Sequence, residues 1–405
     1  MGTANESSQH PIIIIGTGSA GVRLVHQLLY QDPNVSIKIF GGEDQQPYSR
    51  DNLLQMLAGK FTEDQLHAAT ELPQVKNVEI LLNNPIASID PKRATVTDSL
   101  GEVHSYNKLI LAVGAAPRTL QVEGVDLDNV FTFRNIHDAE LLKSRQVSSR
   151  RTVVIGGGQV GLDVAYAMKR HNTEVTVIES SSRLMYHQLD DHASVYLRLY
   201  MADLGVDVRI ERHVVKIEGD SKVTKVVLNT GENIDCDTVI ISIGINPNTK
   251  LALDSGLKIN KGIIVDNQLK TSQENIYAIG ECSEFQGRVF GSAKPGYEQA
   301  EVLANILVNQ KGKYIGSISM SRLSVVDYPI LSIGDNGDDF ISNKEIKYRD
   351  IKKMVYRKLV LKNGKLRGVV AAGKWKDSER LHDLVMKNKH IWPWQRRHFE
   401  KTGEL

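Results

Sequence analysis

Six glycines fall into two groups that share the spacing Gly-x-Gly-x-x-Gly, which is typical of turns that bind phosphate groups. The groups are Gly16, Gly18 and Gly21, and then Gly156, Gly158 and Gly161. In each group the first glycine permits a tight turn, the second lets the backbone approach a pyrophosphate, and the third lets a helix pack closely on a strand. The start of that helix offers free N–H groups and a partial positive charge to the phosphates.

The surrounding residues predict the elements that position these glycines. Residues 11–40 read as an apolar strand, the glycine turn, an amphipathic helix and a second strand, and residues 152–179 repeat this order. Glu43 and Glu179 follow the second strand of each unit, near the spacing of an acid that holds ribose hydroxyls. The positions between the glycines that we also expect to bind a cofactor are Thr17, Ser19, Ala20, Gln159 and Val160.

Either turn alone could be a tight strand-to-helix connection in an unrelated α/β fold. Two such units about 140 residues apart in one chain favour two bound dinucleotides instead. We interpret one of them as a flavin and the other as a nicotinamide.

Composition limits the other classes of function. Lys and Arg total 50 against 48 Asp and Glu, so the charge does not indicate a nucleic-acid binder. The longest apolar run near the N-terminus covers residues 12–15, so we expect no membrane segment or signal peptide and a cytoplasmic location. The two cysteines, Cys236 and Cys282, lack a C-x-x-C spacing, and the histidines lack ligand spacing, so we expect no metal site.

Four further stretches resemble the two-dinucleotide-binding flavoproteins of the pyridine nucleotide–disulfide oxidoreductase superfamily. Residues 106–118 are similar to the segment that ends the first half of the flavin domain, and residues 235–248 to the segment that closes the nicotinamide domain. Residues 271–281 resemble the second flavin motif, whose last acid, here Glu281, binds the ribityl chain. Residues 293–307 resemble the helix whose N-terminus points at the flavin ring.

The resemblance implies FAD and a nicotinamide dinucleotide as cofactors. Gly296 and Tyr297 become candidate backbone donors to the flavin edge that gains negative charge on reduction, which a helix N-terminus favours by ~0.3 to 2 kcal/mol. Without the resemblance, Pro295 would simply indicate the first turn of a helix. The other positions assigned to cofactor binding are Arg50, Ile86, Ala112, Val113, Gly114, Arg118 and Gly244.

The absence of early cysteines distinguishes branches of this superfamily. Dithiol reductases carry their cysteine pair early in the flavin domain, but residues 48–60 contain none, so we expect no thiol chemistry. Residues 47–53 (PYSRDNL) instead resemble the Y-x-R segment of reductases that serve rubredoxins, ferredoxins and oxygenases, and of assimilatory nitrite reductase. Since the chain has no siroheme or iron–sulfur portion, we expect at most an electron-input module of the nitrite reductase type.

Two positions depart from the family pattern. The family often has a lysine and a glutamate paired near the flavin, and the corresponding positions here are Gln55 and Asp163. We interpret them as a hydrogen-bonded pair that lines the nicotinamide pocket, and the alternative is that Asp163 merely favours the first turn of its helix. Their expected catalytic role is positional, because hydride transfer requires no protein proton.

The position of Glu179 bears on cofactor choice. A carboxylate there would bind the ribose hydroxyls and repel a 2′-phosphate, which favours NADH over NADPH. The alternative is an exposed Glu179 with Arg183 nearby to receive a phosphate. The resemblance then implies hydride transfer from NADH to FAD and passage of electrons to an acceptor.

We expect that acceptor to be a small carrier protein, such as a rubredoxin or ferredoxin, or a partner oxygenase or nitrite reductase component. Two other functions stay open. One is an NADH oxidase or quinone reductase that acts on a small oxidant, and the other is a redox sensor that resembles apoptosis-inducing-factor-type flavoproteins.

The expected fold class is α/β, with two Rossmann-like domains and a small α+β C-terminal domain. By the family topology, the FAD domain comprises residues 11–117 and 248–312, the NAD domain residues 118–247, and the C-terminal domain residues 313–405. Asn363-Gly364 between two alternating runs predicts a hairpin in the last domain, followed by a helix. Because that domain commonly builds a dimer in the family, we expect a homodimer.

The last stretch, residues 387–405, is rich in basic and aromatic side chains. It holds five Lys or Arg and two Glu, interleaved with Trp392, Trp394 and Phe399. Packing on the protein's own surface or a dimer contact is the first interpretation. The alternatives, in decreasing order, are docking of an acidic electron carrier, an aromatic lid over the flavin, and nucleic-acid binding.

Overall fold

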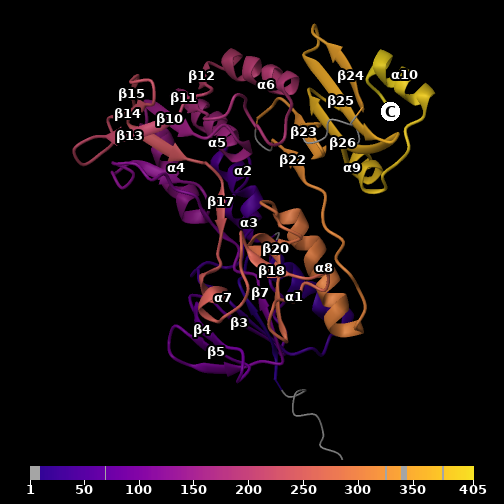
Figure 1. Cartoon of the computed structure of the whole chain (residues 1–405). Helices are drawn as coiled ribbons and strands as arrows, with labels where there is room; N and C mark the ends of the chain where they lie inside the picture. Colours follow the sequence, from indigo (N-terminus) through magenta and orange to yellow (C-terminus); the bar gives the residue numbers. More distant parts are fainter. Residues whose placement is uncertain (1–9, 69, 324–325, 339–343, 376–377) are drawn as a thin grey trace, which may run out of the picture. The chain divides into compact units, whose positions relative to one another are not determined.

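The structure is a computed structural model that describes residues 10–68, 70–323, 326–338, 344–375 and 378–405. The chain divides into two compact units, whose elements are labelled in Figure 1. Unit 1 contains the chain up to Leu53 together with Phe61–Ala116 and Ile245–Ser317. Unit 2 contains Leu54–Lys60, Pro117–Gly244 and Ile318–Leu405. Both units are therefore discontinuous in sequence.

A parallel five-stranded sheet forms the centre of unit 1, in the order β19-β7-β1-β2-β3. All four isoleucines of β1 are buried, as expected for a central strand with both faces covered. Helices α1 and α8 pack against each other. The bounds are β1 (Ile12–Ile15), α1 (Ser19–Gln31), β2 (Ile37–Phe40), β3 (Val78–Leu81), β7 (Lys108–Leu111), β19 (Ile276–Ala278) and α8 (Ala293–Asn309).

Shorter elements complete unit 1. Two antiparallel pairings join β4, β5 and β6 into a small sheet, and β18, β20 and β21 form another. The bounds are η2 (Arg50–Asn52), α3 (Glu63–Ala68), β4 (Ile86–Asp90), β5 (Thr95–Asp98), β6 (Val103–Ser105), β8 (Ala115–Pro117), β17 (Ile245–Pro247), α7 (Lys250–Asp254), β18 (Ile263–Val265), η3 (Gly280–Cys282), β20 (Ser283–Phe285) and β21 (Arg288–Val289).

Unit 2 contains a second parallel sheet, in the order β12-β11-β10-β16-β9. The predicted second β-α-β unit is β10, α5 and β11. The two predicted Rossmann-like sheets are thus confirmed. The bounds are α2 (Leu53–Leu57), β9 (Val130–Thr132), α4 (Ile136–Ser148), β10 (Arg151–Ile155), α5 (Gln159–Lys169), β11 (Glu174–Ile178), α6 (Asp191–Asp203), β12 (Val206–Arg209), β13 (Val214–Glu218), β14 (Lys225–Leu228), β15 (Asn233–Asp235) and β16 (Thr238–Ile241).

The C-terminal part of unit 2 is an antiparallel sheet in the order β22-β23-β26-β25-β24. The predicted hairpin is confirmed, because β25 and β26 pair across Asn363 and Gly364, both of which have positive φ. The bounds are β22 (Met320–Arg322), β23 (Ile330–Gly334), β24 (Lys344–Asp350), β25 (Val355–Lys362), β26 (Lys365–Ala372), α9 (Ser378–Met386) and α10 (Pro393–Thr402).

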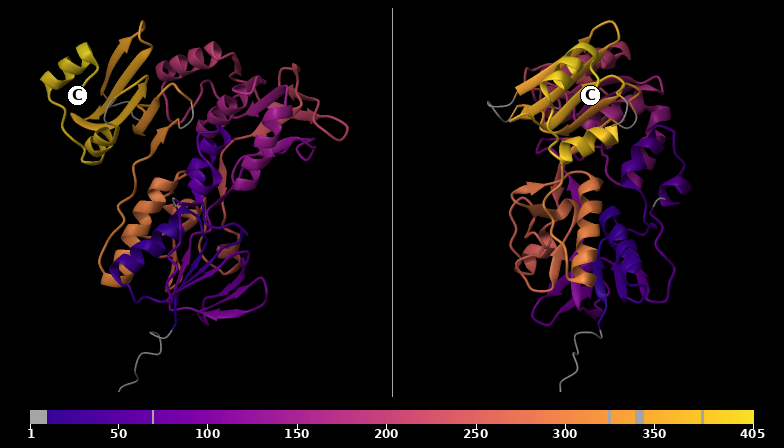
Figure 2. Two further views of the ribbon diagram at one scale, coloured as in Figure 1. Left: turned by 180° about the vertical axis from the view of Figure 1, so that it is seen from behind. Right: turned by 90° about the vertical axis from the view of Figure 1, so that its right-hand side faces the viewer.

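Alternation along β26 decides which helix covers which face of this sheet. Val369 and Ala371 belong to one apolar cluster with residues of α9 and α10, whereas Val370 and Ala372 belong to another with residues of α6. Successive strand residues point to opposite faces, so α9 and α10 cover one face and α6 the other. Figure 2 shows this arrangement from two further sides.

A buried charged cluster fastens the C-terminal sheet to α6. Lys358 of β25 is 1% exposed, and its Nζ lies 2.8 Å from Asp190 Oδ2 and 3.0 Å from Glu345 Oε1. Tyr356 donates its hydroxyl to the same Asp190 oxygen at 2.5 Å, while Asp190 Oδ1 accepts the N–H of Ala193 at the start of α6. Burial opposes ionisation of Asp190 most strongly, but Lys358 and these hydrogen bonds outweigh it and lower its pKa.

Within the described ranges, no helix combines the length and the apolar character needed to cross a membrane.

Candidate dinucleotide-binding sites

The first glycine turn, between β1 and α1, requires glycine at two positions for packing. Gly16 has a φ of +118°, and a Cβ on it would lie 2.2 Å from the carbonyl oxygen of Ala112. A Cβ on Gly21 would lie 2.0 Å from the carbonyl oxygen of Gly16. A Cβ on Gly18 would meet no heavy atom within 4 Å. The open space beside Gly18 therefore fits a group that approaches the backbone at the start of α1.

Three segments of unit 1 meet at that end of α1. A Cβ on Gly280 or on Gly296 would lie 3.1 Å from the Cβ of Ala20 in either case. Tyr297, in the first turns of α8, is hydrogen-bonded to Ser19, and burial raises the pKa of its hydroxyl. Residues that we assigned to one cofactor from three distant parts of the sequence thus lie together.

Glu43, which follows β2, has both carboxylate oxygens engaged. Tyr48 donates its hydroxyl to Oε2 at 2.7 Å, and Arg50 forms an ion pair with Oε1. The Arg50 guanidinium also lies 5.2 Å from the centroid of the Tyr48 ring. Burial opposes the charge of Arg50 most strongly, but Tyr48, Glu43 and Glu281 together outweigh it and raise its pKa. Arg50 therefore pairs with Glu43 and is also stabilised electrostatically by Glu281, the two acids that we assigned to the flavin.

The segment that follows β7 is hydrogen-bonded to Asn248, where the chain re-enters unit 1. The side-chain amide of Asn248 donates to the carbonyl of Val113 at 2.8 Å, and its backbone N–H donates to that of Gly114 at 3.0 Å. Gly114 has a φ of +64°, which favours glycine. This places Ala112, Val113 and Gly114 directly beside the first glycine turn, since Ala112 contacts Gly16.

Two other assigned residues of unit 1 have simpler surroundings. Thr17 packs against Gly41 at the end of β2, where a Cβ would lie 2.8 Å from the threonine hydroxyl. Ile86 begins β4 and is buried in the apolar core of the unit.

The second glycine turn, between β10 and α5, repeats the geometry of the first. Gly156 has a φ of +114°, and its Cβ would lie 2.1 Å from the carbonyl oxygen of Ser242. The Cβ of an alanine at position 161 would lie 2.1 Å from the carbonyl oxygen of Gly156, whereas a Cβ on Gly158 would meet nothing within 4 Å. As in the first turn, the first and third glycines are required for packing, and the second has open space beside it. Gln159 and Val160 form the first residues of α5 next to it.

Glu179 lies at the end of β11 and faces this turn. Its Oε2 accepts the N–H of Gly157 at 2.7 Å, and its Oε1 accepts the N–H of Ser181 at 2.6 Å. Gly244, on the neighbouring segment after β16, has a φ of +107° and accepts the N–H of Arg118 at 2.9 Å. The acid that we expected at the ribose is thus in direct contact with the glycine turn.

Arg183 is committed to other groups. Its guanidinium forms ion pairs with Asp191 and Asp338 and donates to the carbonyls of Leu189 and Tyr186. It also lies 4.4 Å from the centroid of the Tyr186 ring, and 12% of its side chain is exposed. A phosphate would have to displace these partners to reach it.

Asp163 lies deeper in its helix and in the protein than a residue of the first helical turn would. It is the fifth residue of α5, is completely buried, and accepts the N–H of Val326 at 3.1 Å through Oδ1. Gln55 lies half-buried on α2. The side-chain amide of Gln146 joins α2 to α5, because it donates to the carbonyls of Leu57 and Ala167. The two helices that carry Gln55 and Asp163 are therefore neighbours within unit 2.

The two cysteines lie inside the core. Both are free and buried, and burial raises the pKa of each thiol to about 12. Cys282 directs its sulfur to the carbonyls of Leu111 and Ile279. A protonated, enclosed thiol is a poor nucleophile, so neither cysteine suits disulfide or peroxide chemistry.

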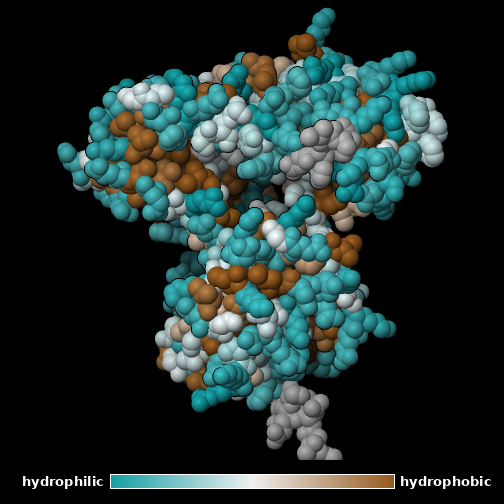
Figure 3. All heavy atoms as spheres, viewed as in Figure 1, coloured by the Kyte–Doolittle hydropathy of each residue, from teal (hydrophilic) through white to brown (hydrophobic). Residues whose placement is uncertain are grey.

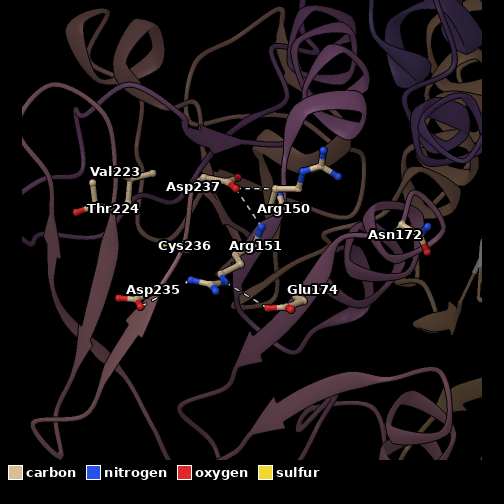
Figure 4. Close-up of a pocket in the computed structure, with 9 residues that line it drawn as sticks. All are labelled: Arg150, Arg151, Asn172, Glu174, Val223, Thr224, Asp235, Cys236 and Asp237. Atoms are coloured by element: carbon tan, nitrogen blue, oxygen red, sulfur yellow. Dashed lines mark hydrogen bonds and ion pairs between the residues drawn. The ribbon is translucent and has the colours of Figure 1, made fainter.

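A pocket of about 540 Å³ lies at the amino end of the unit 2 sheet, away from the glycine turn (Figure 4). The Arg151 side chain lies between Asp235 and Glu174, at 3.8 and 3.3 Å from their carboxylates. Asp237 accepts the backbone N–H groups of Arg150 and Arg151. Because these charges satisfy one another, we do not assign the pocket to either dinucleotide.

Several contacts at these sites were not predicted from the sequence. Tyr48 as a partner of Glu43, Gly157 as a donor to Glu179, and Val326 as a donor to Asp163 are examples. The Tyr-x-Arg spacing of residues 48–50 was the one available signal for the first. Together, two similar cradles with an open position at a helix N-terminus can each hold the pyrophosphate of a dinucleotide.

Comparisons with known proteins agree with this geometry. The sequence pattern of the rubredoxin NAD+ reductase C-terminal domain matches residues 320–389. A nitrite reductase [NAD(P)H] of Bacillus subtilis (strain 168) is 32% identical over 383 residues, which are 94% of this chain and 48% of that protein. The chain thus spans about half the length of the nitrite reductase relative. A rubredoxin-NAD(+) reductase of Pseudomonas putida is 35% identical over 69% of this chain and 74% of its own length.

Among solved structures, a ferredoxin reductase from Rhodopseudomonas palustris superposes with a TM-score of 0.88 at 25% identity, over 96% of this chain and 97% of its own. The sequence pattern of the family described as pyridine nucleotide-disulphide oxidoreductase matches residues 10–303, which include both glycine turns and the segments that converge on the first. This family depends on FAD and NAD(P)H. The chain belongs to the pyridine nucleotide-disulphide oxidoreductase family.

Proposed function

We propose that this protein is an FAD-containing, NADH-dependent reductase that passes electrons to a small carrier protein or to a partner oxygenase or nitrite reductase component. The observation that carries the proposal is the pair of matching cradles, one in each unit, each with open space beside its second glycine. The buried, protonated thiols support an acceptor outside the chain rather than an internal disulfide.

In this proposal the residues of the chain bind and orient the cofactors. When bound, FAD supplies the centre that takes a hydride from NADH and releases electrons singly or in pairs. The N-termini of α1 and α8 place backbone N–H groups near Ala20 and Gly296, where they would favour negative charge. We also propose that Gln55 and Asp163 position the nicotinamide without proton transfer, Asp163 through its hold on Val326.

The contacts of Glu179 and Arg183 support a preference for NADH over NADPH. Glu179 would face a 2′-phosphate with like charge, and Arg183 is already paired with Asp191 and Asp338. We predict that Glu179→Ala lowers the ratio of kcat/KM for NADH to that for NADPH at least tenfold. An unchanged ratio in steady-state assays would mean that Glu179 does not select the cofactor. Glu174→Ala, which removes an exposed carboxylate at the opposite end of the same strand, is the control.

The experiment that tests the proposed function follows NADH oxidation by the FAD-loaded protein with three acceptors. Fast reduction of ferricyanide and of a rubredoxin, with slow reaction with air, is the expected result. Equally fast reaction with air would favour an NADH oxidase. Slow reduction by NADH with a persistent long-wavelength absorption band would favour a redox sensor, and failure to bind FAD would refute the proposal.

Two further expectations, the domain bounds and a homodimer, rest on the resemblance, and a third, the cytoplasmic location, rests on the short apolar runs near the N-terminus. We propose an FAD domain of residues 11–117 and 248–312, an NAD domain of residues 118–247 and a C-terminal domain of residues 313–405. The chain would act in the cytoplasm as a homodimer, which light scattering on the purified FAD-loaded protein tests directly.

A further inference from the structure

Two tryptophans near the C-terminus form an exposed pair, which we call the indole platform (Trp392 and Trp394). Their rings are stacked, with centroids 5.3 Å apart and an interplanar angle of 3°, and they are 49% and 65% exposed. His390 meets Trp392 edge-on at 4.5 Å. Large aromatic side chains are usually buried, so two exposed indoles held against each other are a feature that packing of this chain does not explain.

The platform is held in place by the fold beneath it. Ile391 donates its N–H to Gly364 in the β25–β26 turn at 2.8 Å, and Leu366 donates to the carbonyl of Lys389 at 2.9 Å. Phe399, one turn and a half further along α10, is completely buried in the apolar cluster of the C-terminal sheet. The segment therefore packs through Ile391 and Phe399 and leaves the indoles outside. A platform that is already ordered loses little side-chain entropy on binding.

Exposed cations flank the platform in the sequence. Lys387, Lys389 and Arg397 are exposed, and none of the three forms an ion pair with another described residue. Of the two glutamates in the segment, Glu404 is occupied, because it pairs with Arg357 and accepts from the indole N–H of Trp375. The other, Glu400, is exposed. With five Lys or Arg against these two glutamates, residues 387–405 carry a net positive charge.

We propose that the indole platform and its cations form the docking surface for the acidic protein that accepts electrons from this reductase, a proposal that rests on the proposed function. Trp and Arg side chains are enriched among the residues that contribute most to binding at protein interfaces. Positive charge around them selects an acidic partner and raises the association rate. The matching pattern of the rubredoxin NAD+ reductase C-terminal domain ends at residue 389, so the platform lies beyond the part shared with that domain.

Two other occupants fit less well. In a symmetric dimer the same patch would meet its own copy, so Lys387, Lys389 and Arg397 would face like charges. A helix that lies on a lipid surface needs a free apolar face, but the apolar Phe399 of α10 points into the protein. The surface over α10 is hydrophilic on the face that Figure 3 shows.

The test compares the FAD-loaded full chain with the variants Trp392→Ala/Trp394→Ala and Arg397→Glu. The probes are an acidic rubredoxin and ferricyanide, and kcat/KM is measured at several salt concentrations. We expect kcat/KM for rubredoxin to fall at least tenfold in both variants and to depend less on salt in Arg397→Glu. Ferricyanide reduction should stay within twofold. Tyr30→Ala and Lys92→Glu, an exposed aromatic and an exposed cation of unit 1, are matched controls.

Each other outcome is decisive. Unchanged rubredoxin kinetics in the variants, or a wild type that reduces ferricyanide but not rubredoxin, would overturn the docking surface and leave the reductase intact. A wild type that reduces neither acceptor refutes the proposed function. In that case calorimetric binding of rubredoxin, lost in the double variant, would still support the surface. Platform-dependent sedimentation with phosphatidylserine vesicles, without rubredoxin binding, would assign the surface to lipid instead.

Discussion

The second and third glycines of the second turn, Gly158 and Gly161, should respond in opposite ways to the same small change. Gly158→Ala adds a methyl group that meets no protein atom within 4 Å. Alanine has fewer conformations than glycine in the unfolded chain, which stabilises the folded variant by about 0.4 to 1 kcal/mol. The loss of a glycine that is favoured at the N-cap opposes this and costs about 0.5 to 1 kcal/mol. The free energy of unfolding should therefore change by less than about 0.5 kcal/mol.

Gly161→Ala places its methyl group 2.1 Å from the carbonyl oxygen of Gly156 and 3.5 Å from the Cβ of Ser242. Helix α5 would have to move away from the strands, and overpacking of this kind costs about 1 to 3 kcal/mol. At roughly 2 to 4 °C per kcal/mol, the melting temperature should fall by about 2 to 12 °C.

Binding should show the reverse order. The added methyl group of Gly158→Ala fills the space that we assign to the pyrophosphate, so we expect the Kd for NADH to rise at least tenfold, equivalent to about 1.4 kcal/mol. Thermal unfolding and NADH fluorescence titration of both variants check these values. Gly291→Ala, at an exposed loop glycine without a positive φ whose added Cβ would make only ordinary contact, controls for the loss of a glycine as such. If Gly158→Ala binds NADH like the wild type, or destabilises the fold as much as Gly161→Ala, the open space is not a ligand site.

Two further predictions concern stability. Lys358→Met should lower the free energy of unfolding by about 3 to 5 kcal/mol at pH 7, measured by urea unfolding, and the value should lie near the lower end because Glu345 is 30% exposed. This loss of stability should shrink below about pH 4, because protonated Asp190 no longer needs a cation. A loss that does not depend on pH would contradict the assignment. Asp98 has a pKa of about 2, which is lowered mainly by the hydrogen bond from His104 and then by that from Asn84. Asp98→Asn should therefore lower the melting temperature at pH 7, and the difference from the wild type should vanish as the pH falls from about 4 to 2. An equal difference at both ends of that range would show that Asp98 acts only through its shape.

Local patterns predicted the parts of the site that depend on local structure. The glycine turns follow from spacing, because a tight turn and a close helix demand Gly16, Gly21, Gly156 and Gly161 whatever else the fold does. The Asn363-Gly364 turn follows in the same way from the positive φ of both residues. The order of strand, turn and helix around them was therefore predictable as well.

Contacts between distant residues were not predictable. The N–H of Val326 reaches Asp163 across 163 residues, and Asp338 reaches Arg183 across 155. No periodicity encodes such pairs, because they depend on how whole elements pack. The exposure of Trp392 could not be predicted for the same reason, since it depends on Ile391 and Phe399 filling the core in its place.

The buried charged cluster joins β25 to the start of α6, a helix that ends more than 100 residues earlier in the sequence, through Lys358, Tyr356 and Asp190. The peptide link between Ser317 and Ile318 is consequently not what retains the C-terminal sheet. A protease that cuts beside the exposed Ile315 would leave two fragments that stay associated and run as one species on a native gel. The same site is then a natural point at which to split the coding sequence into two separately expressed halves.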